Sequence, residues 1–162
     1  MRKLDRIIES QFFVLVGDAN GADRSVQQYL STKNYRNVEV FCAGRICRNN
    51  VGGWRTREIH ATAPRGTYAF YAAKDQAMAE EAEYGFMLWD GKSVGTLLNV
   101  ARLLEQHKKV VFYSAPERDF LEFHDRAQWL RFVEKDAPAL KGAMEDKVSM
   151  ERAERYVLPM NM

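Results

Sequence analysis

Residues 12–23, FFVLVGDANGAD, hold the pattern that decides the fold class of this 162-residue chain. Phe12–Val16 is an unbroken run of aromatic, aliphatic and β-branched side chains, which is typical of a strand buried on both faces of a parallel sheet. The run ends at Gly17, and from Ala22 to Thr32 apolar residues recur at helical spacing. This stretch predicts a buried strand, a glycine loop and a helix, which together begin a βαβ unit.

The alternation of strands and helices continues beyond this unit. Strands are expected at Val38–Ala43, Tyr84–Trp89 and Val110–Tyr113, and helices at Met1–Ser10, Ala72–Ala82 and Thr96–Gln106. Because most connections between these segments are short, we expect right-handed βαβ crossovers. The predicted fold class is α/β: a three-layer Rossmann-like domain with a mostly parallel sheet, helices on both of its faces and extra C-terminal helices.

Gly44–Thr67 interrupts this alternation. The segment is rich in arginine, asparagine and glycine and shows no clear period. A loop of that length in a compact domain is usually functional or mobile, so we expect a lid. Its candidate ligand contacts are Arg48, Asn49 and Trp54, because guanidinium groups bind phosphate and an indole ring can stack on a base. The alternative is that these side chains are only solvated.

The C-terminal part of the chain has a different pattern. Helices are expected around Phe120–Lys135 and Ala139–Tyr156, without strands between them. We therefore expect residues 1–115 to form a Rossmann-like ligand-binding domain. Residues 116–162 are expected to form a helical extension that packs on the same domain.

Composition limits the classes of function. Hydrophobic residues make up 46% and charged residues 28%, so a folded core is expected rather than a disordered chain. The net charge of +2 gives too weak a field for duplex nucleic acid, so nucleic acid is not an expected partner. No apolar run approaches the roughly 20 residues of a membrane span, and no signal-peptide core is visible. We expect a cytoplasmic protein without membrane contact.

The chain has two cysteines, Cys42 and Cys47. Two are too few for a disulfide framework, and their spacing lacks the paired C-x-x-C or histidine pattern of a zinc site. We expect both to be reduced thiols and expect no metal site.

The loop between the first strand and its helix is the first candidate binding site. Its candidate residues are Gly17, Asp18, Asn20, Gly21, Ala22 and Asp23. Glycines let the backbone approach a ligand closely, and the free N–H groups of a helix start attract phosphate or carboxylate. The alternative is a plain strand-to-helix turn in which Asp23 caps the helix.

A second loop with the same setting follows the strand expected at Tyr84–Trp89. Its candidate residues are Asp90, Gly91, Lys92, Ser93, Gly95 and Thr96. In an open parallel sheet both loops would lie at the carboxyl ends of their strands, where ligands bind. The sequence therefore predicts a nucleotide-like ligand held between the two loops, although Lys92 and Ser93 also fit a solvated turn.

Three motifs, taken in order, resemble the SLOG superfamily, particularly its small YspA-like bacterial members. They are G17-D-A-N-G-A-D23, K74-D75-x-x-M78-A79-x-x-A82 and W89-D-G-K-S-x-G-T96, and the resemblance covers about Phe12–Tyr113. It implies a Rossmann-like fold that binds nucleotides or their derivatives, and it adds Lys74 to the candidate ligand contacts. The superfamily also includes DprA and the LOG-type phosphoribohydrolases.

The sequence departs from the LOG-type enzymes at one position that matters for catalysis. Their G-G-x-G-T-x-x-E element ends in an acidic residue that serves glycosidic cleavage, whereas Gly95-Thr96 is followed here by Leu97, Leu98 and Asn99. Asp75 and Glu58 are the weak substitute candidates for an acid or base. Each also has a simpler interpretation, since Asp75 suits a helix N-terminus and Glu58 lies among arginines.

These observations favour a nucleotide-binding sensor or effector that requires no cofactor. The alternatives are a LOG-like N-glycosidic phosphoribohydrolase or nucleoside transferase, and a scaffold module that has lost its ligand. A homodimer is also expected. Its candidate surface residues are Met78, Leu97, Val100, Leu103 and Leu104, each of which could instead belong to the core.

Overall fold

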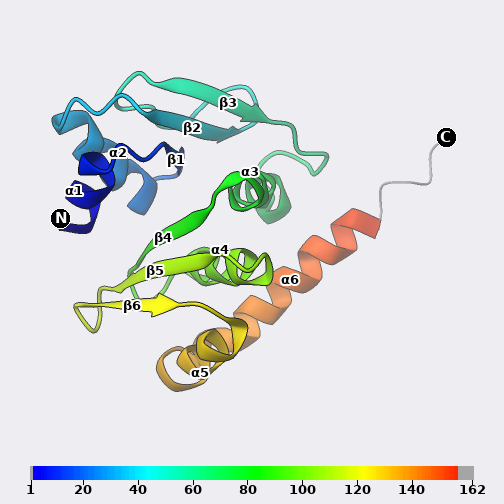
Figure 1. Ribbon diagram of the computed structural model, residues 1–162. Helices are drawn as coiled ribbons and strands as arrows, with labels where there is room; N and C mark the ends of the chain where they lie inside the picture. Colours follow the sequence, from blue (N-terminus) through cyan, green and yellow to red (C-terminus); the bar gives the residue numbers. More distant parts are fainter. Residues whose placement is uncertain (1, 157–162) are drawn as a thin grey trace. The chain divides into compact units, whose positions relative to one another are not determined.

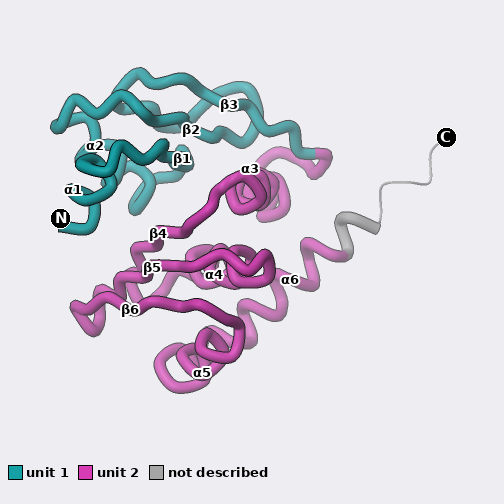
Figure 2. The backbone as a smooth tube through the Cα atoms, in the orientation of Figure 1, with its two compact units in different colours: residues 1–61 teal, residues 62–162 magenta. Residues whose placement is uncertain are grey.

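The computed structural model describes residues 2–156, with side chains up to residue 152. The chain forms two compact units, Met1–Ala61 and Thr62–Met162, which are coloured separately in Figure 2. The domain boundary expected at residues 115 and 116 falls inside the second unit. Residues 157–162 of the expected C-terminal extension lie outside the described part of the chain.

The first unit is a small parallel sheet with two helices (Figure 1). Its elements are α1 (Arg2–Glu9), β1 (Val14–Gly17), α2 (Ala22–Thr32), β2 (Val38–Ala43) and β3 (Arg55–Ile59). The strand order is β1-β2-β3, and both pairs are parallel, with Val14 opposite Val38 and Glu39 opposite Arg55. The expected βαβ unit is confirmed, with α2 and β2 at the predicted bounds.

The core of this unit lies on one face of the sheet. Side chains alternate between the faces of a strand, so Val38, Val40 and Cys42 of β2 point to the same side. The buried residues of this core are Val16, Leu30, Tyr35, Val38, Val40, Cys42 and Trp54. Ile8 of α1 and Val26 of α2 pack against them, which places both helices on this face.

Two sequence expectations for this unit were wrong. Phe12 and Phe13 are 56% and 63% exposed and precede β1, so the buried strand is shorter than its apolar run. The Gly44–Thr67 segment contains the edge strand β3, where an irregular lid was expected. Its sequence, RTREI, has a single apolar residue, because an edge strand pairs on one side only and faces solvent.

The second unit contains a mixed sheet and four α-helices. Its elements are α3 (Tyr68–Glu81), β4 (Tyr84–Trp89), α4 (Val94–Glu105), β5 (Lys109–Ser114), β6 (Asp119–Phe123), α5 (Arg126–Asp136), the short 3₁₀ turn η1 (Pro138–Leu140) and α6 (Lys141–Tyr156). In the order β4-β5-β6, β4 pairs with β5 in parallel and β5 pairs with β6 antiparallel. The α/β class is confirmed, as two three-stranded sheets.

Strand β6 is a correction to the sequence analysis, which expected a helix from Phe120. Leu121 pairs with Phe112 across the antiparallel ladder, and the tight connection before it passes through Arg118 at a positive φ of 54°. The following helix starts six residues later than expected, at Arg126. Asp125 fixes that start, because its carboxylate accepts the N–H of Gln128 at 2.8 Å.

Aromatic rings fill the core of the second unit. Phe112 of β5 has ring centroids of Trp89, Phe123, Trp129 and Phe132 within 5.2–6.0 Å. The buried residues of α4 that pack on the same core are Leu97, Val100, Leu103 and Leu104. These four leucine and valine side chains were candidates for a dimer surface, and their burial within the unit excludes that role. Met78 is only partly buried.

Within residues 2–156, no helix combines the length and the apolar character needed to cross a bilayer.

Candidate functional site

The N-terminus of α2 is the most open helix start among the candidate loops. Gly21 occupies its N-cap with φ 88° and ψ −122°, and no side chain caps the helix there. A Cβ built on Gly21 would meet nothing within 4 Å. The first N–H groups of an α-helix have no partner within the helix and carry the positive end of its dipole. This end of α2 can therefore receive an anion.

Asp23 closes the loop instead of capping the helix. Its Oδ2 atom accepts the backbone N–H of Ala19 at 3.0 Å, which ties the first turn of α2 back to the loop. The alternative in which Asp23 caps α2 is therefore not what the structure shows.

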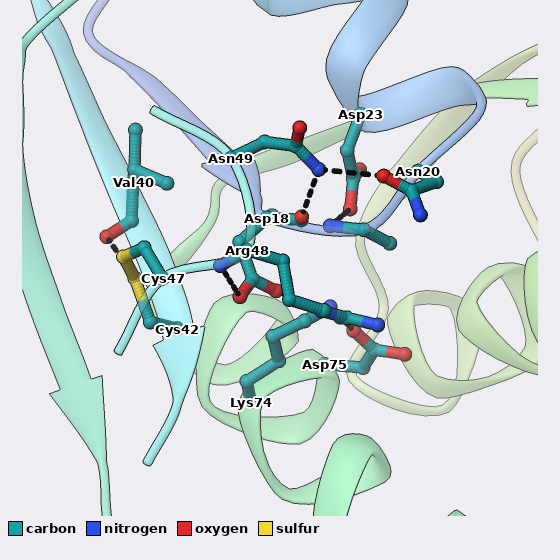
Figure 3. A network of polar contacts seen from close by, with 12 residues as sticks. Asp18, Asn20, Asp23, Val40, Cys42, Cys47, Arg48, Asn49, Lys74 and Asp75 are labelled. Atoms are coloured by element: carbon teal, nitrogen blue, oxygen red, sulfur yellow. Dashed lines mark hydrogen bonds and ion pairs between the residues drawn. A yellow bond between two sulfur atoms is a disulfide. The ribbon is translucent and has the colours of Figure 1, made fainter. Parts of the chain in front are cut away.

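Asp18 is turned into the protein and pairs with Arg48, one of the candidate lid residues. Its side chain is only 1% exposed. Oδ1 accepts the Arg48 guanidinium at 2.8 Å, and Oδ2 accepts the Arg48 backbone N–H at 3.0 Å (Figure 3). A buried carboxylate needs such charged and hydrogen-bonded partners, so this pair fixes the position of the loop.

Asn49 adds a second connection between the same two segments. Its Nδ2 atom donates to the carbonyl oxygen of Asp18 at 2.8 Å and to Oδ1 of Asn20 at 2.9 Å (Figure 3). Trp54, the third candidate lid residue, lies elsewhere: it is buried in the core and its Nε1 donates to the carbonyl of Tyr35 at 2.8 Å. Arg48 and Asn49 thus hold the Gly17–Asp23 loop, while Trp54 is a core residue.

Gln27 of α2 is an organising residue that the sequence analysis missed. Its side chain is fully buried, and Nε2 donates to the carbonyls of Gly17 at 2.8 Å and Asn49 at 3.2 Å. Its Oε1 accepts the N–H of Val51 at 2.9 Å. The sequence did offer one sign of this role. Gln27 lies three residues before Leu30 and therefore on the buried face of the helix, where a polar side chain is unusual.

Cys42 and Cys47 form a disulfide, which corrects the expectation of two reduced thiols. Cys42 is completely buried near the end of β2, and the chain then turns back through Gly44, whose φ is 79°. This turn brings the two Cα atoms to 5.0 Å, within the range that a disulfide requires. Spacing alone did not reveal that a strand end and its turn would bring the sulfurs together.

Asp18 lies close to this disulfide. One potential ligand atom from each of Asp18, Cys42 and Cys47 falls within 4.8 Å of the others, so the three could hold a metal ion. Metals bind thiolates, however, and sulfurs that are bonded to each other offer none.

The second candidate loop satisfies its own hydrogen bonds. Oδ1 of Asp90 accepts the backbone N–H groups of Lys92 at 2.9 Å and Ser93 at 2.8 Å, and these bonds lower the pKa of Asp90. Ser93 is the N-cap of α4 and accepts the N–H of Thr96 at 3.3 Å. Amides that a phosphate would need are therefore occupied by side chains of the loop, as in a solvated turn.

Lys74 and Asp75 lie on α3 and belong to a polar network inside the second unit. The ammonium group of buried Lys74 is 2.7 Å from Oδ1 of Asp75 (Figure 3). The other oxygen of Asp75 accepts the amide of Asn99 on α4 at 3.2 Å. Asp75 therefore links α3 to Asn99, three residues after Thr96.

Arg102 extends this network towards α6. It donates to Oδ1 of Asn99, to the hydroxyl of Tyr68 and to the carboxylate of Glu151. Burial raises the pKa of Tyr68 to about 12, although the neighbouring Arg102 acts in the opposite direction. A hollow of about 280 Å³ adjoins the network, and Arg102, Glu105 and Glu151 are among the residues that line it.

Glu58 is exposed on the edge strand β3, and the neighbouring arginines pair elsewhere. Arg57 is 2.8 Å and Arg55 is 3.5 Å from the carboxylate of Glu39, a buried residue of β2. These two arginines therefore pair with Glu39. The sequence analysis also missed Glu39, the buried acid within an otherwise apolar strand.

Comparisons of the chain with protein-family models, with curated proteins and with solved structures found no match.

Proposed function

We propose that this chain binds a nucleotide or a nucleotide derivative and acts as a sensor or effector, with a ligand phosphate at the N-terminus of α2. The observation that carries the proposal is the exposed helix start at Gly21, which has no side-chain cap and open space beyond its Cα. Uncapped backbone N–H groups at the positive end of a helix are a general solution for binding phosphate.

The contacts behind the loop support the same proposal. Asp18, Arg48 and Gln27 fix the loop backbone from the protein side and leave Ala22 exposed at the first position of α2. A loop that is already ordered loses little conformational entropy on binding, so affinity is higher for the same contacts. The Arg48 side chain is 37% exposed, and its charge is compensated by the Asp18 carboxylate at 2.8 Å.

The Asp90–Thr96 loop has a lesser part in the proposal. A phosphate at this loop would compete with Asp90 for the N–H groups of Lys92 and Ser93. We also propose that the chain is related to the SLOG superfamily. That relationship implies a three-layer Rossmann-like arrangement and a ligand contact at this second loop. We therefore expect the N-terminus of α2 to contribute more to phosphate binding than the second loop.

A substitution at Ala22 tests the proposed phosphate position. Ala22→Glu adds a negative charge in the first turn, which stabilises a helix by about 0.3–1 kcal/mol but repels a phosphate. Ala22→Gln is the matched neutral control. Purified variants are heated with a panel of nucleoside mono-, di- and triphosphates, because a ligand at about 100 times its Kd adds roughly 2.7 kcal/mol of stability.

The expected result is a thermal shift that Ala22→Gln retains and Ala22→Glu loses, while Ala22→Glu alone is at least as stable as the unsubstituted chain. Equal shifts for both variants would remove α2 from the site. The absence of a shift with every nucleotide would favour the scaffold alternative.

A LOG-like hydrolase or transferase is the second candidate, and one observation favours it. Asp75 places a carboxylate oxygen 3.2 Å from the amide of Asn99, beside the position where the LOG-type enzymes carry their acid. Against this, the ammonium of Lys74 lies 2.7 Å from Oδ1 of Asp75, so this carboxylate already has a charged partner. Incubation with nucleoside monophosphates separates the candidates: steady release of free base that Asp75→Asn abolishes would establish the enzyme and contradict the binding protein.

A further inference from the structure

The Cys42–Cys47 disulfide closes a very short stretch of chain next to the loop proposed to bind phosphate. The two cysteines are five positions apart, so their bond restricts the local chain far more than it restricts the whole unfolded protein. Cys42 is completely buried, whereas Cys47 is only partly buried. Cys47 is therefore the more accessible of the two cysteines.

The residues that follow Cys47 directly are those that hold the loop. Arg48 binds both carboxylate oxygens of Asp18, and Asn49 binds the Asp18 carbonyl and Asn20. Gln27 then links Asn49 to Gly17. The disulfide thus ties Arg48 and Asn49 to β2. These two residues donate the hydrogen bonds that hold residues 17–20.

We propose that Cys42–Cys47 is a redox-active site, modified by dithiol reductants, whose oxidised form holds residues 17–23 in the binding conformation and whose reduced form releases them. Non-bonded sulfurs stay farther apart than the roughly 2 Å of a disulfide bond, so reduction separates the two sulfurs, and we expect the partly buried Cys47 and the adjoining Arg48 to move. Two thiols then replace the disulfide beside the buried Asp18 carboxylate. The proposal extends the function proposed above, since it concerns the same loop.

The exchange reaction balances with a dithiol as the partner. A thiolate of the reductant attacks the Cys47 sulfur, the S–S bond breaks, and its electron pair goes to the Cys42 sulfur, which takes up a proton. The second thiolate of the reductant attacks the mixed disulfide and releases Cys47, which also takes up a proton. The reductant leaves as a disulfide and has supplied two electrons and two protons.

Hydrogen exchange of the full chain, with and without dithiothreitol and without denaturant, tests this proposal. Alkylation and mass measurement report the fraction reduced. We expect complete reduction, with exchange of residues 17–23 and 45–51 faster by about tenfold or more and β5 unchanged. The variant Cys42→Ala/Cys47→Ala is the matched control, and we expect it to exchange like the reduced chain in both conditions.

Three results would overturn the proposal. Unchanged exchange in residues 17–23 after complete reduction would make the disulfide a local staple, and faster exchange throughout β1, β2 and α2 would make it a requirement of the fold. Thiols in the chain purified without reductant, together with one bound zinc ion that Asp18→Asn abolishes, would make the cluster a metal site. Hydrogen exchange needs no ligand, so it tests this proposal independently of nucleotide binding. Titrations of the oxidised and reduced chains with nucleotides test the binding function separately.

Discussion

Asp18 receives two hydrogen bonds from Arg48, one from the guanidinium at 2.8 Å and one from the backbone N–H at 3.0 Å. The two residues lie 30 positions apart in the sequence, at the end of β1 and beyond the end of β2. A side chain and a backbone group of one residue therefore fix both oxygens of one buried carboxylate. This contact makes the conformation of the Gly17–Asp23 loop depend on the segment that follows β2.

Removal of the Arg48 side chain tests the strength of this pair. Arg48→Ala leaves the buried Asp18 carboxylate with a single Arg48 hydrogen bond, and we expect a loss of about 2–3 kcal/mol in the free energy of unfolding. The exposed Lys33–Asp5 pair, at 3.8 Å, supplies the control. Lys33→Ala should change stability by less than about 1 kcal/mol in the same urea titrations. Equal losses for both variants would contradict a special role for Arg48.

A second stability test concerns the buried amide of Gln27. Gln27→Leu keeps the approximate volume but leaves the Gly17 and Asn49 carbonyls and the Val51 N–H without this partner, so we expect a loss of about 2–4 kcal/mol. Gln28→Leu, on the exposed side of the same helix, is the matched control and should stay within about 0.5 kcal/mol. Urea unfolding of both variants gives the comparison, and similar values would refute the bridging role.

The raised pKa of Tyr68 predicts a pH dependence of stability. Its pKa lies at about 12 in the folded chain against 10.0 for an ordinary tyrosine, because burial disfavours the phenolate. The stabilisation is fully present below pH 10 and is lost as the pH rises towards 12, since the unfolded chain ionises first. Tyr68→Phe should therefore lose less stability than the unsubstituted chain between pH 10 and pH 12. Parallel pH profiles for the two proteins would contradict the assignment.

Two glycines of the second loop should respond differently to the same substitution. Gly91 has φ 87°, and a Cβ there would lie 2.7 Å from Cγ of Pro116, so Gly91→Ala should cost about 2 kcal/mol or more. A Cβ at Gly95 would meet only the Ser93 hydroxyl, at 3.9 Å. Because Gly95 lies within α4, Gly95→Ala should be neutral or stabilising by up to about 1 kcal/mol. Thermal unfolding measures both, and a reversed order would show that the loop has another conformation.

The strongest periodic segments were predicted well, for a physical reason. Strands β2 and β4 and helix α2 were expected at their observed bounds, since buried faces impose regular apolar patterns. Strand β3 was not predicted, because RTREI is an edge strand that pairs on one side only and therefore has no regular apolar pattern. Strand β6 was mistaken for the start of a helix, because Phe120 and Leu121 also fit the pattern of the helix that begins at Arg126.

The Gly17–Asp23 loop was predictable in position but not in its contacts. The glycine loop at Gly17–Asp23 follows from local sequence, whereas the pairing of Asp18 with Arg48 depends on two strand ends meeting in space. The same limit applies to the Cys42–Cys47 disulfide, which needs the turn at Gly44. The homodimer remains a prediction, and of its candidate residues only Met78 is still partly accessible.

A ¹H–¹⁵N correlation spectrum recorded during titration with inorganic pyrophosphate, and then with the nucleotide that gives the largest thermal shift, tests the phosphate position most directly. If the phosphate lies at the start of α2, the amide signals of Ala22, Asp23 and Arg24 should move most, in a saturable way and at the same positions for both ligands. Saturable shifts confined to other segments, with these three amides unmoved, would contradict the account.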